Sequence, residues 1–226
     1  MDDPNRALFE SVVRLLAPVL DELVFVGGCT TGMFITDPAA SGIRPTKDVD
    51  AIVDVTSYGK YAALADKLRA IGLVEDTTEG APLCRWRYGA LIVDVMPTDA
   101  TVLGFSNRWY PEAIETATTT DVADYRIRLV TPALFIATKL EAFRGRGGGD
   151  VSASHDLEDI IAVVDGRPEI VSEVAVAPSG VREYIAAEIH ALLENRDFIE
   201  ALPGFLLPDA ASQARRDILE ERLRRL

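Results

Sequence analysis

The hydrophobic pattern of this chain changes near residue 130, and that change limits the possible folds more than any other feature. Before it, apolar residues form short β-prone runs or alternate with polar residues, as strands do. Strands are expected at 23–26, 49–55, 85–88, 91–96 and 125–130. Helical spacing occurs between them at 6–20, 29–35 and 58–71. Beyond residue 131 the periodic segments are all helical, at 132–143, 157–164, 181–195 and 212–226.

This pattern predicts two parts of an α/β (α+β) chain. Residues 1–130 are expected to form a mixed-sheet core, and residues 131–226 a helical C-terminal region. Within the first part, residues 37–42 carry Asp, Pro and Gly and predict a loop. Within the second, 144–151 is a glycine-rich connector between two helices. A hydrophobic content of 48% indicates that most of the chain is folded.

Composition also narrows the cellular setting. The two cysteines do not make a disulfide framework and suit a reducing compartment. The acidic N-terminus lacks a secretory signal, and no apolar run approaches the roughly 20 residues that cross a bilayer. We therefore expect a cytoplasmic protein that does not contact membranes. The net charge of −13 argues against a general nucleic-acid binder, because phosphate contacts need Lys and Arg.

The most informative residues are the carboxylates Asp48 and Asp50, which flank Val49 at the start of a predicted strand. Residues i and i+2 of a strand point to the same side. Two like charges so close resist ionisation unless a cation neutralises them, and Mg²⁺ prefers such oxygen ligands. Asp48 and Asp50 are therefore candidate metal ligands. Asp54 shares their face but lies too far along the strand to share the cation.

A third acid, Asp94, lies inside the apolar run 91–95. An unpaired carboxylate in a buried strand is costly, so Asp94 is expected to have a partner. If the two strands are neighbours, Asp94 converges with Asp48 and Asp50 as a third metal ligand. The alternative is Asp99, which follows Pro97 and thus the end of the strand. Two metal ions held this way can clamp the attacking and leaving oxygens of phosphoryl transfer.

A glycine turn precedes these acids. Gly27 and Gly28 follow a strand and open a helical segment, where backbone N–H groups can approach the phosphates of a nucleotide. Thr30 and Thr31 are candidate hydroxyl donors to the same ligand. The alternative is that the glycines serve only packing. Cys29 is interpreted as a small packing residue, because no histidine arrangement would support thiol catalysis.

Together these residues resemble the nucleotidyltransferase superfamily with the DNA polymerase beta fold. The shared pattern is a hydrophobic residue with Gly-Gly, then Asp-hydrophobic-Asp, then a third acid on a later strand; here it is Val26-Gly27-Gly28, Asp48-Val49-Asp50 and Asp94. The spacer of nineteen residues from 29 to 47 is longer than the usual one, and the extra length is expected in the 37–42 loop. The resemblance implies transfer of NMP from an NTP to a hydroxyl acceptor, with two Mg²⁺ ions as cofactors.

The C-terminal part resembles the AbiEii family, the nucleotidyltransferase toxins of type IV toxin–antitoxin pairs. Lys139 on one predicted helix is followed by Asp156 and Asp159 on the next, although His155 stands where a basic residue is usual. The resemblance implies that Lys139 binds the triphosphate and that Asp156 acts beside it, in a helical region that closes one wall of the nucleotide cleft. It also implies an RNA acceptor such as a tRNA 3′ end, and a cognate antitoxin as partner.

Plainer interpretations stay open for several of these residues. Lys139 can be a surface lysine, and Asp156 and Asp159 can be first-turn acids favoured by the helix dipole. The arginines of 215–225 are expected to form a solvated, salt-bridged helix face rather than an RNA-binding patch. Two other functions also remain. One is a nucleotidyltransferase for small hydroxylated molecules such as antibiotics, which the acidic charge favours. The other is a non-catalytic nucleotide-binding protein.

Overall fold

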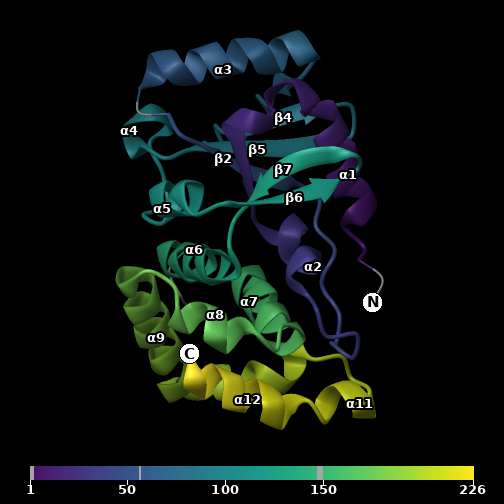
Figure 1. Cartoon of the computed structure of the whole chain (residues 1–226), viewed down its shortest axis with the longest axis vertical. Coiled ribbons are helices and arrows are strands. Elements are labelled where there is room, and N and C mark those ends of the chain that lie inside the picture. The colour runs from purple at the N-terminus through teal and green to yellow at the C-terminus, as the bar shows by residue number, and fades with distance from the viewer. Residues whose placement is uncertain (1–2, 56, 147–149) are drawn as a thin grey trace. The chain divides into compact units, whose positions relative to one another are not determined.

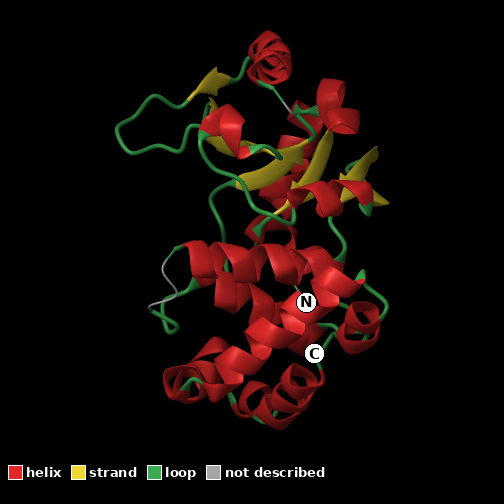
Figure 2. Cartoon of the chain, turned by 90° about the vertical axis from the view of Figure 1, so that its left-hand side faces the viewer, coloured by secondary structure: helices red, strands yellow, loops and turns green. Residues whose placement is uncertain are grey.

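The structure, a computed structural model, describes residues 3–55, 57–146 and 150–226. The chain packs as two compact units. The sheet unit comprises Asn5–Thr30 and Pro45–Thr131. The helical unit comprises Thr31–Arg44 and Pro132–Leu226, together with Asp3 and Pro4. Every described strand belongs to the sheet unit. Figure 1 labels several of these strands, and Figure 2 draws the strands in yellow.

The sheet has seven strands and is mixed. The strands are β1 (Leu23–Val26), β2 (Val49–Val53), β3 (Val74–Glu75), β4 (Arg85–Tyr88), β5 (Leu91–Pro97), β6 (Thr118–Val122) and β7 (Tyr125–Leu129). Their order across the sheet is β3-β4-β5-β2-β1-β7-β6. The pairs β1–β7 and β2–β5 are parallel, and the other neighbours are antiparallel. The predicted mixed sheet is thus confirmed, with β1 and β2 at its centre.

Burial follows position in the sheet. All four residues of β1 are buried, whereas both residues of the edge strand β3 are exposed. Apolar runs such as Leu-Val-Phe-Val suit a central strand that is covered on both faces. Among the covering helices, α1 (Arg6–Leu15) places Phe9 edge-on against Phe25 of β1, with ring centroids 5.1 Å apart.

Further helices of the sheet unit begin and end where the sequence supplies caps. The helix α3 (Tyr58–Ile71) starts after Ser57, whose side chain accepts from the Lys60 amide, and ends at Gly72, whose φ is 104°. It packs on the sheet through Tyr61, whose hydroxyl donates to the Val95 carbonyl at 3.1 Å. The remaining short helices are η1 (Ala17–Glu22), η2 (Gly28–Thr30), α4 (Ala100–Leu103) and α5 (Tyr110–Glu115).

The helical unit is organised around α6 (Pro132–Gly145). Every residue from Ala133 to Leu140 is buried, which is the pattern of a helix packed on all sides. The other helices are α2 (Thr31–Phe34), α7 (His155–Gly166), α8 (Ile170–Ala175), α9 (Ser179–Glu194), α10 (Arg196–Ala201), η3 (Leu202–Phe205), α11 (Ala210–Gln213) and α12 (Arg216–Arg225). Among them α7, α8 and α9 contact α6, and α12 contacts α7.

Residues 31–44 belong to this unit through specific contacts. The Thr36 and Asp37 amides both donate to the Gly166 carbonyl at 2.9 Å. The Asp37 carboxylate pairs with Arg215 at 2.7 Å. From the sequence, residues 31–44 were expected in the sheet core, but they belong to the helical unit. The chain leaves the sheet unit for the last time after Thr131, one residue from the boundary expected between 130 and 131.

Several elements differ from the sequence prediction. The helix expected over 6–20 ends at Leu15, because Pro18 cannot donate a backbone hydrogen bond, and a 3₁₀ turn follows. The helix expected over 29–35 is divided into η2 and α2. In the connector expected at 144–151, residues 147–149 lie outside the described residues. None of the described helices combines the length and the apolar character that crossing a membrane requires.

Candidate functional site

The strand register brings two of the candidate carboxylates side by side. The parallel pairing of β2 and β5 sets Asp50 opposite Asp94, so both side chains leave the same face of the sheet. Asp48 precedes Asp50 by two residues and belongs to the same face. We call Asp48, Asp50 and Asp94 the acidic face. The expectation that β5 lies beside β2 is confirmed.

Arg85 lies among these carboxylates. It is opposite Asp94 in the antiparallel pairing of β4 and β5. Its guanidinium binds Asp94 with two hydrogen bonds, Nε to Oδ1 at 2.9 Å and Nη2 to Oδ2 at 2.7 Å. The same Nη2 donates to Asp48 Oδ2 at 2.9 Å. The hydrogen bonds that Arg85 donates to Asp94 are the main reason that the pKa of Arg85 lies above its usual value. The partner expected for the buried Asp94 is therefore an arginine, which the sequence analysis did not identify.

Asp48 is also held by its own loop. Thr46 donates its hydroxyl to Asp48 Oδ1 at 2.9 Å. The Thr46 amide donates to the Asn5 side chain at 2.8 Å, which fixes this loop against the start of α1. Both oxygens of Asp48 therefore accept hydrogen bonds, and its orientation does not depend on Arg85 alone.

Gly27 is required by Asp50. Its φ is +77°, and a Cβ placed on it would lie 1.9 Å from Asp50 Oδ2. Because real Cβ atoms do not approach an oxygen so closely, only glycine leaves room for this carboxylate. The two halves of the motif, the glycine turn and the acid pair, are thus in direct contact within the sheet unit.

Replacing Gly27 by Ala should lower the free energy of unfolding of the sheet unit by about 2–4 kcal/mol, through backbone strain and the clash with Asp50. The matched control is Gly59→Ala in the first turn of α3, where an added Cβ meets no atom within 4 Å. That change should be neutral or stabilise by up to about 1 kcal/mol. Chemical denaturation followed by tryptophan fluorescence measures both, since Trp86 and Trp109 lie in the sheet unit. Equal effects at the two glycines would contradict the role of Gly27.

Other residues of the glycine turn are deeply buried. The Thr30 hydroxyl donates to the Gly27 carbonyl at 2.8 Å, and Thr30 has no exposed surface. Thr31, which belongs to the helical unit, is 1% exposed. In this conformation Thr30 therefore stabilises the turn, and the predicted contacts of Gly28, Thr30 and Thr31 with a nucleotide stay a prediction.

Neither cysteine has the features of a nucleophile. Neither forms a disulfide, and both are buried. Burial, aided by the negative charges of Asp94 and Asp50, raises the pKa of the Cys84 thiol to about 12. A thiol reacts as its thiolate, so Cys84 is unreactive at neutral pH.

Alkylation tests this state of Cys84. In the native protein at pH 9, iodoacetamide should leave Cys84 almost unmodified, because the folded protein keeps the thiol protonated well above the ordinary pKa of 9.0. In denaturant the thiol should be alkylated within minutes. Peptide mass spectrometry distinguishes Cys84 from Cys29. Rapid labelling of Cys84 in the folded protein would show that burial and the acidic face do not suppress its ionisation.

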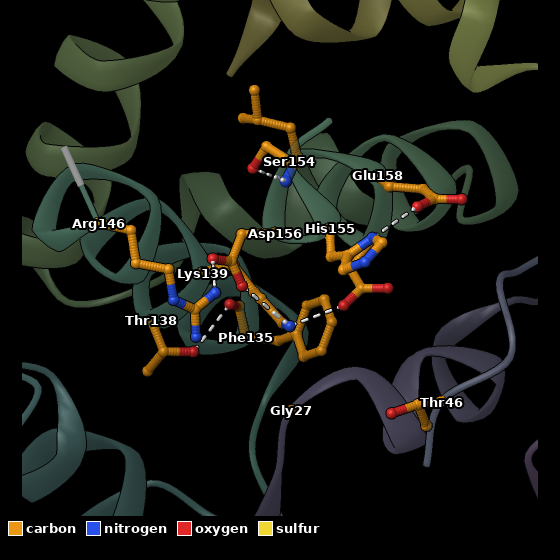
Figure 3. Close-up of polar contacts among 12 residues, drawn as sticks. Gly27, Thr46, Phe135, Thr138, Lys139, Arg146, Ser154, His155, Asp156 and Glu158 are labelled. Atoms are coloured by element: carbon orange, nitrogen blue, oxygen red, sulfur yellow. Dashed lines mark hydrogen bonds and ion pairs between the residues drawn. The ribbon is translucent and has the colours of Figure 1, made fainter. Parts of the chain in front are cut away.

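The second group of candidate residues lies in the helical unit. Lys139 of α6 donates to Asp156 Oδ1 at 3.2 Å and to Asp159 Oδ2 at 2.7 Å, both on α7 (Figure 3 shows Lys139 and Asp156). Lys139 is 9% exposed, and the two acids are 3% and 1% exposed. Lys139 is therefore not a surface lysine. Asp156 does lie in the first turn of α7, but both acids are buried and paired with Lys139. The expected pairing of Lys139 with Asp156 is present.

Two arginines complete this group, which we call the Lys139 cluster. Arg44 binds Asp159 in bidentate fashion, with both hydrogen bonds at 2.9 Å. Arg146 donates to Asp156 Oδ2. Around Asp156 a pocket opens that is lined by Arg146, Ser154 and His155 among others. The i, i+3 spacing of Asp156 and Asp159 already indicates that both face one side of α7. Arg44 was not predicted to contact them.

The remaining residues with plainer interpretations are His155 and the arginines of 215–225. His155 is largely exposed and pairs with Glu158 at 3.3 Å. On α12, Arg216 and Arg224 pair with Glu220, and Arg225 pairs with Glu221. Arg215, just before α12, binds Asp165 and Asp37 inside the unit. The salt-bridged surface that was expected is therefore present for Arg216, Arg224 and Arg225. Arg215 is instead buried, and Arg222 donates to the backbone carbonyls of Val164 and Asp165.

The donor set of the acidic face suits a divalent cation, because three carboxylates lie on one face of neighbouring strands. In the conformation described here the position between Asp48 and Asp94 is taken by Arg85. Accordingly, across residues 3–55, 57–146 and 150–226 no three Asp, Glu, His or Cys side chains enclose a position for an ion. The carboxylate oxygens of the acidic face are of the type that Mg²⁺ prefers. In this structure the Arg85 guanidinium supplies the positive charge beside them.

Comparison with known proteins gives the class of fold. No protein-family model and no functionally curated protein matches this chain. Among solved structures, the chain is similar to the crystal structure of an antigenic nucleotidyltransferase-like protein from Paracoccidioides brasiliensis. The similarity covers 86% of this chain and 93% of that one, with a TM-score of 0.51 and 19% sequence identity. The chain therefore has a nucleotidyltransferase-like fold, with a mixed-sheet core and a helical region, as the motifs predicted. The resemblance to the AbiEii toxins stays a prediction.

Proposed function

We propose that this protein is a Mg²⁺-dependent nucleotidyltransferase that transfers NMP from an NTP to a hydroxyl acceptor and releases pyrophosphate. The observation that carries the proposal is the acidic face. Asp50 and Asp94 are in register on parallel strands, Asp48 shares their face, and Gly27 makes room for Asp50. A nucleotidyltransferase-like fold with these acids at its centre suits phosphoryl transfer, which depends mainly on positioning and charge neutralisation.

Each acid has a distinct part in this proposal. Asp48 and Asp50 would hold the two predicted Mg²⁺ ions, with Asp94 as third ligand; bound there, the ions neutralise charge on the reacting phosphates. Asp94 would also orient the acceptor hydroxyl or take its proton.

Lys139 is proposed to neutralise the triphosphate. Its Nζ donates to both Asp156 and Asp159, and these two carboxylates offset the cost of burying an ammonium group. An ammonium acts on phosphate as a point charge. Asp156 would hold Lys139 in place, a role that its position between Lys139 and Arg146 supports.

The acceptor that we propose is RNA, with a tRNA 3′ end as the leading candidate, and a toxin–antitoxin pair as the setting. The support is the resemblance of Lys139, Asp156 and Asp159 to the AbiEii pattern. A small hydroxylated molecule is the second candidate acceptor. The net charge of −13 and the salt-bridged arginines of α12 favour it, since both weaken attraction to a polyanion.

Transfer of label distinguishes these proposals. The full chain is incubated with Mg²⁺ and each NTP in turn, labelled on the α-phosphate, with total RNA or a panel of hydroxylated antibiotics as acceptor. A nucleotidyltransferase transfers this label to the acceptor, and a γ-label leaves in pyrophosphate. Label in RNA supports the first candidate, and label in an antibiotic supports the second. Binding of NTP without transfer to any acceptor would instead indicate a non-catalytic nucleotide-binding protein.

A further inference from the structure

We propose that Arg85 is a built-in counter-cation of the acidic face and that a divalent metal ion must displace it from Asp48 and Asp94. This inference rests on the proposed function, because it concerns the metal ion of the same site. It makes Arg85 a positioning residue that holds the carboxylates in place when the metal is absent and sets the affinity for the metal.

The position of one atom carries the inference. Arg85 Nη2 lies 2.7 Å from Asp94 Oδ2 and 2.9 Å from Asp48 Oδ2. A cation that two carboxylates share occupies just such a point between them. A guanidinium and a divalent ion cannot both take it, because their contact distances overlap and their charges repel.

The surroundings of Arg85 make this contact more than a chance surface pair. Asp94 is 6% exposed, so its charge requires a partner in the absence of metal. The antiparallel register of β4 and β5 sets Arg85 opposite Asp94. The planar fork of the guanidinium then binds both Asp94 oxygens, and such bidentate pairs are among the stronger ion pairs.

Release of Arg85 is also feasible. Its side chain is 22% exposed and comes from a strand near the edge of the sheet. Arginine carries several rotatable bonds, and its charge can move toward solvent without a change in the strand. The metal-free protein is therefore expected to keep Arg85 on the acidic face, and the metal-bound protein to keep it away.

Mn²⁺ binding to the full chain, without nucleotide, tests the competition by electron paramagnetic resonance. Replacing Arg85 by Gln removes the competing charge and should strengthen Mn²⁺ binding about tenfold or more, or about 1.4 kcal/mol per factor of ten. The matched control is Arg87→Gln, two residues along the same strand, where the arginine pairs with Asp76 at 2.6 Å. Arg87→Gln should bind Mn²⁺ as the unchanged protein does.

A second variant guards against misfolding of the first. Arg85→Lys keeps the charge but loses the bidentate geometry, so its affinity for Mn²⁺ should lie between those of the unchanged protein and Arg85→Gln. Equal or weaker Mn²⁺ binding by a folded Arg85→Gln protein overturns the inference, because the guanidinium then does not compete with the metal ion. If no variant binds Mn²⁺, both the inference and the metal assignment in the proposed function are wrong.

Discussion

Replacing Asp50 by Asn is expected to reduce NMP transfer by about three orders of magnitude or more. The change keeps the shape that fits against Gly27 but removes the charge that would bind the metal. A bound metal ion stabilises the charge of the transition state by several kcal/mol, and each 1.36 kcal/mol changes the rate about tenfold. Asp48→Asn should have a similar effect. The fold should persist, because both substitutions are close to isosteric.

The control for this experiment is Asp54→Asn. Asp54 lies just beyond the end of β2 and is exposed, so its loss should change the rate less than about twofold. Single-turnover transfer of α-phosphate label measures all three variants, and far-UV circular dichroism checks their fold. Near-normal transfer by Asp50→Asn, or an equal loss in Asp54→Asn, would remove the acidic face from the proposed mechanism.

The largest expected effect on stability is at Asp159. Its carboxylate is 1% exposed and accepts hydrogen bonds from Arg44 and Lys139. Replacing it by Asn leaves two cations without their shared partner in a buried setting. Breaking a buried ion pair in this way costs about 3–5 kcal/mol. The free energy of unfolding of the helical unit should fall by that amount.

Glu158 offers a control on the same helix turn. It pairs with the exposed His155, and Glu158→Gln should change stability by less than about 1 kcal/mol. Urea unfolding followed by circular dichroism at 222 nm reports the helices. Tryptophan fluorescence reports the sheet unit, which holds both tryptophans. If Asp159→Asn leaves the circular dichroism transition unchanged, the Lys139 cluster does not stabilise its unit.

The elements with strong local signals were predictable from sequence. The strand Leu23–Val26 and the helix Tyr58–Ile71 have the predicted bounds, because the first is a short apolar run and the second has a serine cap and a terminal glycine. The strand β6 (Thr118–Val122) was missed. Most of its residues are exposed, and without a buried face a strand shows no clear alternation. Its turn to β7 also lacks glycine, with Ala123 and Asp124 at positive φ instead.

The candidate-site residues that show a local sequence pattern were predicted. The residues whose contacts depend on strand register or on a remote part of the chain were not. The i, i+2 spacing identified Asp48 and Asp50, and an acid within an apolar run identified Asp94. Arg85 was missed because its contact with Asp94 depends on the register of a hairpin, which composition does not specify. Arg44 was missed because its partner Asp159 is 115 residues away in the sequence.

Residues 31–44 belong to the helical unit although the sheet unit precedes and follows them in the sequence, and this has a consequence for synthesis of the protein. On the ribosome this segment emerges early, but its contacts Asp159, Asp165 and Arg215 emerge more than a hundred residues later. During synthesis this segment therefore lies between Gly28 and Asp48 of the sheet unit without the residues that it contacts in the folded protein. Neither unit is a continuous stretch of polypeptide. A chain synthesised only to residue 131 contains all of β1–β7 but lacks Asp159, the partner of Arg44. The helical unit can be completed only after residues 132–226 have left the ribosome.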